Sequence, residues 1–273
     1  MTSLTSLTTM ISQTLPILGS SLTLLLLCVV LLWLWSIKIN NASIIDIFWG
    51  IACATPAWVA YIFADGYPPR KLLLVSLATL WAVRLSGYLA IRNIGHGEDP
   101  RYTAMRSRAP AGSNPNLFTL KKVFLLQGVI AWLIAMPIQL GQIGGPAQLG
   151  WLAILGTMVF FIGLAFETIG DYQLKRFKAD PANKGKLMTR GLWSWTRHPN
   201  YFGDSAVWFG LTLVAIENPL ALFGIYSPAL MLFFLTKVTG KSLLEKGMRE
   251  RYTEYDDYVK RVSGFFPRPP KNV

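Results

Sequence analysis

Seven long stretches of mostly apolar residues constrain this chain more than any other feature of its sequence. They lie at residues 16–37, 43–64, 71–92, 121–140, 148–172, 202–216 and 219–238. A helix needs roughly 20 apolar residues to cross the hydrocarbon core of a bilayer, and the sixth stretch is the shortest. Because lipid offers no partners to backbone polar groups, such stretches cross as helices. We therefore expect an all-α integral membrane bundle of about seven transmembrane helices, forming one domain over residues 1–273.

The basic residues indicate how this bundle is oriented. If the N-terminus lies outside, the outer segments hold only Arg70 and Lys71, the inner segments hold 23 Lys and Arg residues, and Arg84 lies within a span. Short cytoplasmic loops carry such an excess, so the sequence predicts an outer N-terminus and an inner C-terminus. Beyond the last span, residues 241–261 are charged but place aromatic and apolar residues at helical spacing. This pattern predicts an amphipathic cytoplasmic helix that lies along the membrane or caps the inner loops.

The composition excludes several classes of protein. The chain is 52% hydrophobic and 15% charged, whereas soluble domains have about 25% charged residues. Its net charge of +12 is concentrated in short loops beside the predicted spans, with no nucleic-acid-binding motif, so we expect membrane lipid and not nucleic acid as a partner. Cys28 and Cys53 both lie in predicted helices, and there are two His residues. Neither a disulfide framework nor a metal site is expected.

Three sets of polar residues interrupt the apolar stretches. In the fifth stretch and just beyond it, Glu167, Asp171, Lys175 and Lys178 share one helix face. A carboxylate followed by cations suits a ligand with ribose hydroxyl groups and phosphates, although a row of ion pairs at the membrane boundary gives the same pattern. In the third stretch, Trp81, Arg84, Tyr88 and Arg92 also share a face.

Arg84 and Asp46 are the charged groups that lie within apolar runs of the third and second stretches. A charge at such depth faces the bundle interior, a partner or water. Arg84 therefore predicts either a structural pair with Asp46 or Asp204, or an Arg that acts in catalysis or binds phosphate. Burial favours the neutral form of a carboxyl group, which makes Asp46 a candidate proton donor. The alternative is that Asp46 simply stabilises the start of its helix.

The third polar set, at residues 197–204, reads Arg-His-Pro-Asn-Tyr-Phe-Gly-Asp. Pro199 fits the first turn of a helix, so Arg197 and His198 precede a helix N-terminus, where anions bind. Asn200 and Asp204 are then one turn apart on the same helix face. The chain contains no Rossmann or P-loop glycine motif, so any nucleotide is expected between helices and inner loops.

Residues 197–204, with Asp171-Tyr172 before them and the segment 254–267 after them, resemble the steroid 5-alpha-reductase family. The resemblance is closer to its bacterial-type branch, the DUF1295 proteins, and extends to residues 43–50 and 81–102. It therefore covers most of the chain, with most of the cofactor motif in residues 120–273. The wider superfamily includes sterol reductases and isoprenylcysteine carboxyl methyltransferases. The resemblance implies a membrane fold of about seven helices whose cytoplasmic half binds NADPH, with a lipid-accessible pocket above the nicotinamide.

The cofactor half of the chain resembles that family more closely than the substrate half. The steroid reductases carry a Gln-Glu pair on the second helix and a Tyr on the third that hold the enone, where this chain has Ile45-Asp46 and Trp81. On the cofactor side, the resemblance places Asn200 at the nicotinamide with Asp204 beside it. It also matches Asp171 to a cofactor-binding Asp and Lys178 to a basic residue that contacts phosphate. Arg84 and Tyr88 align with an Arg and a Tyr of the family's third helix.

The resemblance and the residues together predict an NADPH-dependent reductase of a conjugated carbon–carbon double bond in a lipophilic substrate, such as a steroid or another enone. The expected catalytic residues are Asp46, Tyr88 and Asp204. The expected cofactor-binding residues are Arg84, Arg92, Arg101, Tyr102, Asp171, Lys175, Lys178, Arg190, Arg197, His198, Asn200 and Tyr201.

Two alternatives stay open. A His-Pro-x-Tyr-x-Gly pattern also occurs in the isoprenylcysteine methyltransferases, which use S-adenosylmethionine, although the basic residues after the fifth stretch favour a polyphosphate cofactor. The second alternative is a lipid-binding membrane protein without catalytic activity, since Ile45-Asp46 replaces the Gln-Glu pair. The chain is expected to be a monomer in a bacterial inner membrane, with the endoplasmic reticulum as the other location.

Overall fold

The structure is a computed structural model that describes the backbone of residues 2–238 and 241–271 and the side chains of residues 12–237 and 244–271. Within these ranges every regular element is helical, and the only β pairing is a single bridge between Thr196 and Ser263. The chain forms two compact units, one comprising Met1–Ala153 and Val214–Ile225 and the other Ile154–Leu213 and Tyr226–Val273. The all-α prediction is therefore confirmed for the described part of the chain.

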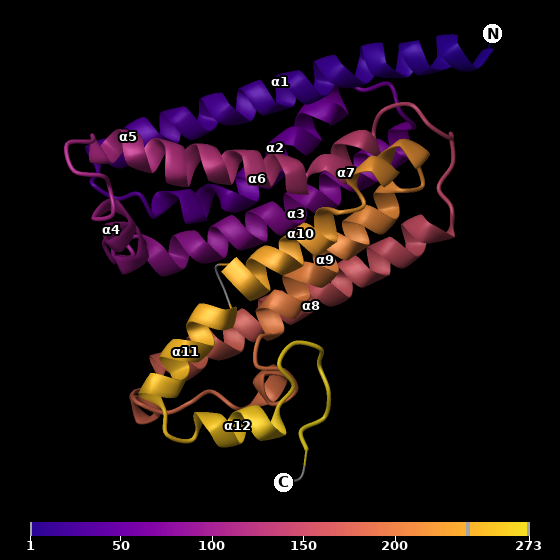
Figure 1. Ribbon diagram of the computed structural model, residues 1–273. Coiled ribbons are helices and arrows are strands. Elements are labelled where there is room, and N and C mark those ends of the chain that lie inside the picture. The colour runs from indigo at the N-terminus through magenta and orange to yellow at the C-terminus, as the bar shows by residue number, and fades with distance from the viewer. Residues whose placement is uncertain (1, 239–240, 272–273) are drawn as a thin grey trace. The chain divides into compact units, whose positions relative to one another are not determined.

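The first unit is built around three long helices, α1 (Thr2–Lys38), α2 (Ile44–Phe63) and α3 (Pro68–Asn93). Helix α2 packs against both α1 and α3, and α6 lies along α1 and α2 (Figure 1). Shorter elements complete the unit: α4 (Pro100–Arg106), α5 (Pro115–Thr119), a π-helical segment (Leu120–Leu125), α6 (Leu126–Ile134), α7 (Met136–Leu140) and a 3-10 turn (Pro219–Gly224).

Local sequence explains where these helices begin and end. Asn40 adopts a positive φ of 51° directly after α1, a conformation that Asn tolerates better than most residues. Helix α3 begins with Pro68, whose missing N–H costs nothing in the first turn. Asp99 caps α4 by accepting a hydrogen bond from the N–H of Arg101. The predicted helix 121–140 is divided at Ala135, just before Pro137, because proline removes a helical hydrogen bond.

Arg70 fixes the segment that follows α7. Its side chain is fully buried, and it donates hydrogen bonds to the carbonyl oxygens of Gly141 at 2.8 Å, Gly144 at 2.7 Å and Pro146 at 2.7 Å. A buried cation is tolerated only where such partners surround it. Arg70, which the charge count assigned to an outer segment, is therefore a structural residue of the first unit.

The second unit contains most of α8 (Trp151–Ala179) and α9 (Pro199–Ala215). Glycines let their backbones approach closely: a Cβ on Gly203 would lie 2.5 Å from the carbonyl oxygen of Gly163 and 2.6 Å from the nitrogen of Glu167. A Cβ on Gly210 would lie 2.5 Å from the carbonyl oxygen of Gly156. Small residues at such positions are how membrane helices pack tightly. The same unit includes α10 (Ser227–Phe233), a π-helical segment (Phe234–Val238), α11 (Lys241–Arg251) and α12 (Tyr255–Arg261).

The C-terminal segment forms two helices where the sequence predicted one. Tyr255, Tyr258 and Val262 make a small buried core, and Leu187 from the loop after α8 packs against it. Of the two arrangements that the sequence left open, the structure thus shows the segment covering a loop, the one after α8. The break falls between α11 and α12, at residues 252–254.

Six helical segments in the described residues are long and apolar enough to cross a membrane. They are Ser12–Lys38, Ile44–Phe63, Pro68–Asn93, Pro115–Ile134, Trp151–Ala179 and Pro219–Lys237. The remaining predicted span, 202–216, lies in α9, which has 17 residues and is too short by this measure. The multi-pass membrane architecture is confirmed with six segments of full length, and the orientation of the termini stays a prediction.

Replacing Gly203 by alanine tests the close contact of α8 and α9. The new methyl group meets backbone atoms that cannot rotate away, so we expect Gly203→Ala to destabilise the protein by about 1–3 kcal/mol. Gly87→Ala in α3 is the matched control, because no atom lies within 4 Å of its added Cβ, and it is expected to be neutral or stabilising. Thermal unfolding of the detergent-purified protein measures both, and equal midpoints would contradict the packing argument.

Candidate active site

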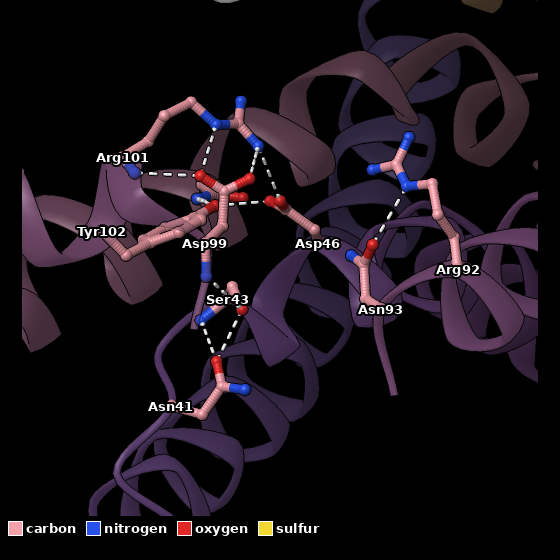
Figure 2. Close-up of polar contacts among 9 residues, drawn as sticks. Asn41, Ser43, Asp46, Arg92, Asn93, Asp99, Arg101 and Tyr102 are labelled. Atoms are coloured by element: carbon pink, nitrogen blue, oxygen red, sulfur yellow. Dashed lines mark hydrogen bonds and ion pairs between the residues drawn. The ribbon is translucent and has the colours of Figure 1, made fainter. Parts of the chain in front are cut away.

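A polar centre in the first unit surrounds Asp46, which lies in the first turn of α2. The hydroxyl of Tyr102 donates a short hydrogen bond to Oδ1 of Asp46, and Nη2 of Arg101 lies 3.2 Å from Oδ2 (Figure 2). Nε2 of Gln127 donates to the Tyr102 hydroxyl at 3.4 Å. Both oxygens of Asp46 are therefore bound by residues of α4.

Asp99 holds Arg101 in place beside Asp46. Its Oδ1 accepts from Nε of Arg101 at 3.0 Å and its Oδ2 from Nη2 at 2.9 Å. The hydrogen bond from Arg101 lowers the pKa of Asp99 despite partial burial. With one guanidinium shared between two carboxylates, little of its charge is left for a phosphate. Binding of cofactor phosphates by Arg101 stays a prediction.

Tyr102 keeps its proton at neutral pH. Burial raises the pKa of its phenol, and the negative charge of Asp46 raises it further. The phenol is therefore a fixed hydrogen-bond donor aimed at a carboxylate. The sequence predicted that Tyr102 binds the cofactor and that Asp46 is a catalytic residue. The structure brings the two together, which the turn Asp99-Pro100 makes possible by starting α4 next to α2.

One face of α3 carries Arg84, Tyr88 and Arg92, as the sequence predicted. The guanidinium carbon of Arg84 lies 5.5 Å from the ring centre of Tyr88, and that of Arg92 lies 5.8 Å from it. Cations attract an aromatic ring at such distances. Tyr88 thus lies against two arginines, and its proposed catalytic role remains a prediction.

The second unit contains a different polar centre, which we call the C-terminal clamp: Arg197, His198 and Glu245. Oε1 of Glu245 accepts from Nε of Arg197 at 3.0 Å and lies 3.0 Å from Nε2 of His198. The three side chains are 9%, 7% and 14% exposed. Nη1 of Arg197 also donates to the carbonyl oxygens of Val259 at 3.4 Å and Val262 at 2.8 Å. The clamp therefore joins the start of α9 to α11 and to the end of α12.

Further hydrogen bonds extend the C-terminal clamp along the chain. The N–H of Arg197 donates to the carbonyl oxygen of Ser263 at 2.9 Å, and Oγ1 of Thr196 donates to that of Phe265 at 2.8 Å. The Tyr258 hydroxyl donates to the carbonyl oxygen of Trp193 at 2.5 Å. The sequence predicted that Arg197 and His198 bind the cofactor. The structure shows both engaged by the C-terminal segment.

The charge of Glu245 is strongly stabilised. Burial acts to raise the pKa of its carboxyl group, but the hydrogen bond from His198 and the charge of Arg197 outweigh it and hold the pKa at about 2. Glu245 is therefore ionised at every physiological pH. Glu245 was not predicted from the sequence because it lies in a helix of mixed charge, where it is one of two acids among basic residues.

The residues of the motif that follow Pro199 face another acid. Nδ2 of Asn200 donates to Oδ1 of Asp171 at 3.2 Å, and Tyr201 stacks in parallel on His198 with ring centres 5.4 Å apart. Asp171 and Asp204 are 5% and 8% exposed. The structure thus brings Asp171 of α8 together with Asn200 of α9.

The cations expected at a cofactor lie on the surface of the second unit. Lys175 and Lys178 are exposed on the last turns of α8, and Arg190 is exposed in the loop that follows. Glu167, one turn before Asp171, is 3% exposed. The interface of α8 and α9 is therefore rich in buried carboxyl groups, and its basic residues lie towards solvent. Among the described residues no group of three His, Cys, Asp or Glu side chains could hold a metal ion.

Comparison with known proteins decides the family of the chain. The sequence model of the family described as "Protein of unknown function (DUF1295)" matches residues 32–262. The chain belongs to the DUF1295 family. Both polar centres, from Asp46 to Glu245, lie inside the matched range. No solved structure matches the chain significantly.

Three relatives resemble the chain to different extents. The uncharacterized protein C594.04c of Schizosaccharomyces pombe is 27% identical over an alignment 276 residues long. The alignment covers 87% of this chain and 76% of that protein. The probable O-methyltransferase ustE of Ustilaginoidea virens is 33% identical over 88 residues, 32% of this chain and 29% of ustE. Protein-S-isoprenylcysteine O-methyltransferase of Xenopus laevis is 30% identical over 121 residues, 41% of this chain and 40% of the enzyme. The DUF1295 chain thus shares a minor part of the length of two methyltransferases.

Removal of the Glu245 charge tests the C-terminal clamp. A carboxyl group with a lowered pKa stabilises the fold above its ordinary pKa of 4.5 and loses that effect as the pH falls towards about 2. We expect Glu245→Gln to raise hydrogen exchange of residues 255–268 by about tenfold to a hundredfold at pH 7, as the loss of charged hydrogen bonds predicts. After correction for its intrinsic pH dependence, hydrogen exchange of residues 255–268 should rise in the wild type as the pH falls from 5 to 2. In the variant it should not change with pH.

Glu250→Gln is the matched control for this experiment. Glu250 lies on the same helix, α11, but is exposed to solvent. Glu250→Gln should leave hydrogen exchange of residues 255–268 as it is in the wild type, both at pH 7 and as the pH falls from 5 to 2. Equal effects of the two substitutions would show that the helix needs negative charge in general and not the clamp.

The Tyr102–Asp46 pair yields a separate prediction. Tyr102→Phe leaves a buried carboxylate oxygen without its donor and should cost about 1–3 kcal/mol of unfolding free energy. Tyr172→Phe, at a residue that is 57% exposed, should change it by less than about 0.5 kcal/mol. Thermal unfolding of Tyr102→Phe, Asp46→Asn and the double variant gives the coupling energy. Simple additivity of the two losses would contradict a direct interaction.

Proposed function

We propose that this chain is a membrane enzyme that transfers a methyl group from S-adenosylmethionine to a lipophilic acceptor. The observation that carries the proposal is the engagement of Arg197 and His198 by Glu245. The sequence favoured NADPH because these residues, with others, were available for its phosphates. Because the C-terminal clamp engages both, two of the residues that favoured a polyphosphate cofactor already have a partner in the chain.

The charges at the interface of α8 and α9 also favour a cationic cofactor. Glu167, Asp171 and Asp204 are buried carboxyl groups on these two helices. S-adenosylmethionine carries a sulfonium and an ammonium group, and opposite charges attract most strongly away from water. NADPH carries phosphates, which acidic surroundings repel. When bound, S-adenosylmethionine supplies an activated methyl group.

The chain's own residues would bind and orient this cofactor. Asp171 accepts hydrogen bonds from cationic and hydroxyl groups, and Asn200, already bonded to Asp171 at 3.2 Å, offers a carbonyl acceptor and an amide donor. The partial likeness to the two O-methyltransferases supports the same reaction class. The apolar composition of the chain favours an acceptor that reaches the site from the bilayer.

A second candidate function is the NADPH-dependent reduction of a conjugated double bond, favoured by the Tyr102–Asp46 pair. Reduction of an enone needs a donor that polarises its carbonyl oxygen. Tyr102 is a buried phenol that keeps its proton, and it would act as this donor by exchanging its hydrogen bond to Asp46 for one to the substrate. Lys175, Lys178 and Arg190 are exposed cations for the phosphates. Methyl transfer needs neither feature.

Binding of radiolabelled cofactors to the detergent-purified protein tests the proposal. We expect S-adenosylmethionine to bind and NADPH to bind at least tenfold more weakly. Asp171→Asn and Asn200→Ala should each weaken S-adenosylmethionine binding by tenfold or more, because each removes one partner of a buried pair. Asn183→Ala, in the turn after α8, is the control and should bind as the wild type does.

The other outcomes each overturn the proposal in a defined way. Tight NADPH binding that is lost in a Lys175→Gln, Lys178→Gln double variant, without binding of S-adenosylmethionine, would establish the reductase. Binding of neither cofactor to folded protein would leave the lipid-binding protein without catalytic activity.

A further inference from the structure

An apolar groove runs between α2 and α3 of the first unit, nearer to the other ends of these helices than the polar centre around Asp46. Its volume is about 450 Å³, which lies in the range of about 300–1,000 Å³ typical of ligand sites. Trp58 and Tyr61 of α2 form one wall. Their ring planes meet at 79°, and their ring centres are 5.6 Å apart. Leu72, Thr79 and Leu80 of α3 form part of the other wall.

Two polar groups of the groove's walls, those of Trp58 and Thr79, are bonded within the protein. Nε1 of Trp58 donates to Oγ1 of Thr79 at 2.9 Å, and Oγ1 of Thr79 donates to the carbonyl oxygen of Val75 at 2.7 Å. Each group has its partner without water, so an apolar chain can cover it at no loss of hydrogen bonds. A polar ligand would gain little in the same place.

One end of the groove carries a positive charge. Nζ of Lys71 lies 5.5 Å from the ring centre of Tyr61 and donates to the carbonyl oxygen of Ala64, at the end of α2. An ammonium group has three donors, so two remain for an anion. Arg70, its neighbour, is buried in bonds to carbonyl oxygens. The two cations that the sequence placed together thus have different roles.

The length of the groove matches one half of a bilayer. From Lys71 to Val83, which also lines the groove, the helix rises about 18 Å at 1.5 Å per residue. Half of the hydrocarbon core measures about 15 Å. The groove therefore runs from the membrane surface at Lys71 to near the bilayer centre at Val83.

We propose that this groove binds one acyl chain of an anionic phospholipid whose phosphate contacts Lys71. The charge selects an anionic headgroup, the aromatic wall and the closed hydrogen bonds select an apolar chain, and the length selects one leaflet. This site is independent of the proposed methyl transfer.

Native mass spectrometry of the full chain, released from detergent with added lipid, tests the site. We expect phosphatidylglycerol to bind at least fivefold more tightly than phosphatidylcholine with the same acyl chains. Lys71→Gln should abolish this preference. Leu80→Trp should weaken both lipids at least fivefold by filling the groove. Val83→Phe repeats that test at a residue that is 67% exposed, should Leu80→Trp fail to fold.

Lys38→Gln is the matched control for charge. Lys38 also lies over an aromatic ring, 5.4 Å from the centre of Trp35, at the end of a helix, but Trp35, unlike Tyr61, does not line the groove. It should keep the preference for phosphatidylglycerol. An equal loss in Lys38→Gln and Lys71→Gln would overturn the proposal in favour of general electrostatic attraction.

Two further outcomes would overturn it. Displacement of the lipid by free glycerol phosphate at the same concentration would show a headgroup site without a chain. A dimer that is lost in Leu80→Trp, with lipid binding unchanged, would show that a second copy of the chain covers the groove. Cross-linking from a photoreactive acyl chain to residues 58–83 is the result expected.

Discussion

A polar group in the hydrocarbon core has no water to bond with, and most of this structure follows from that constraint. It requires helices where the chain crosses the membrane, and it requires polar side chains to bond one another. Ser21, for example, joins Gln139 and Trp132 in a small network between helices. Arg70 meets the same requirement by saturating its guanidinium with backbone carbonyl oxygens. Burial of charge and polarity thus fixes the positions of loops as well as helices.

Residues 197–204 divide into two parts because Pro199 begins a helix between them. Before it, Arg197 and His198 point to Glu245 and secure the C-terminal segment. After it, Asn200 meets Asp171 of α8. One short motif therefore combines a structural role with the binding role that we propose for Asn200, and a substitution on either side of the proline disturbs a different part of the second unit.

The sequence predicted the helices well because apolar length and composition report directly on burial in lipid. It anticipated that the sixth stretch is short, and it placed Asp171 and Asn200 at one site. It could not predict the partners of Asp46 or Glu245, since Tyr102 is 56 residues from Asp46 and His198 is 47 residues from Glu245. Periodicity identifies the face of a helix but not what covers it. For the same reason, the break between α11 and α12 went unpredicted.

The C-terminal clamp also orders the assembly of the chain in time. Thr196 bonds to Phe265, which lies 69 residues later, and ribosomes add about 5–20 residues per second, so the loop before α9 waits roughly 3–14 seconds for its partner. Until Glu245 has been added, 48 residues after Arg197, the Arg197 guanidinium has no carboxylate from α11 to neutralise it. The second unit therefore reaches its final form only after nearly all of the matched sequence has been synthesised, and a ribosome that stalls before Glu245 leaves a chain that cannot close.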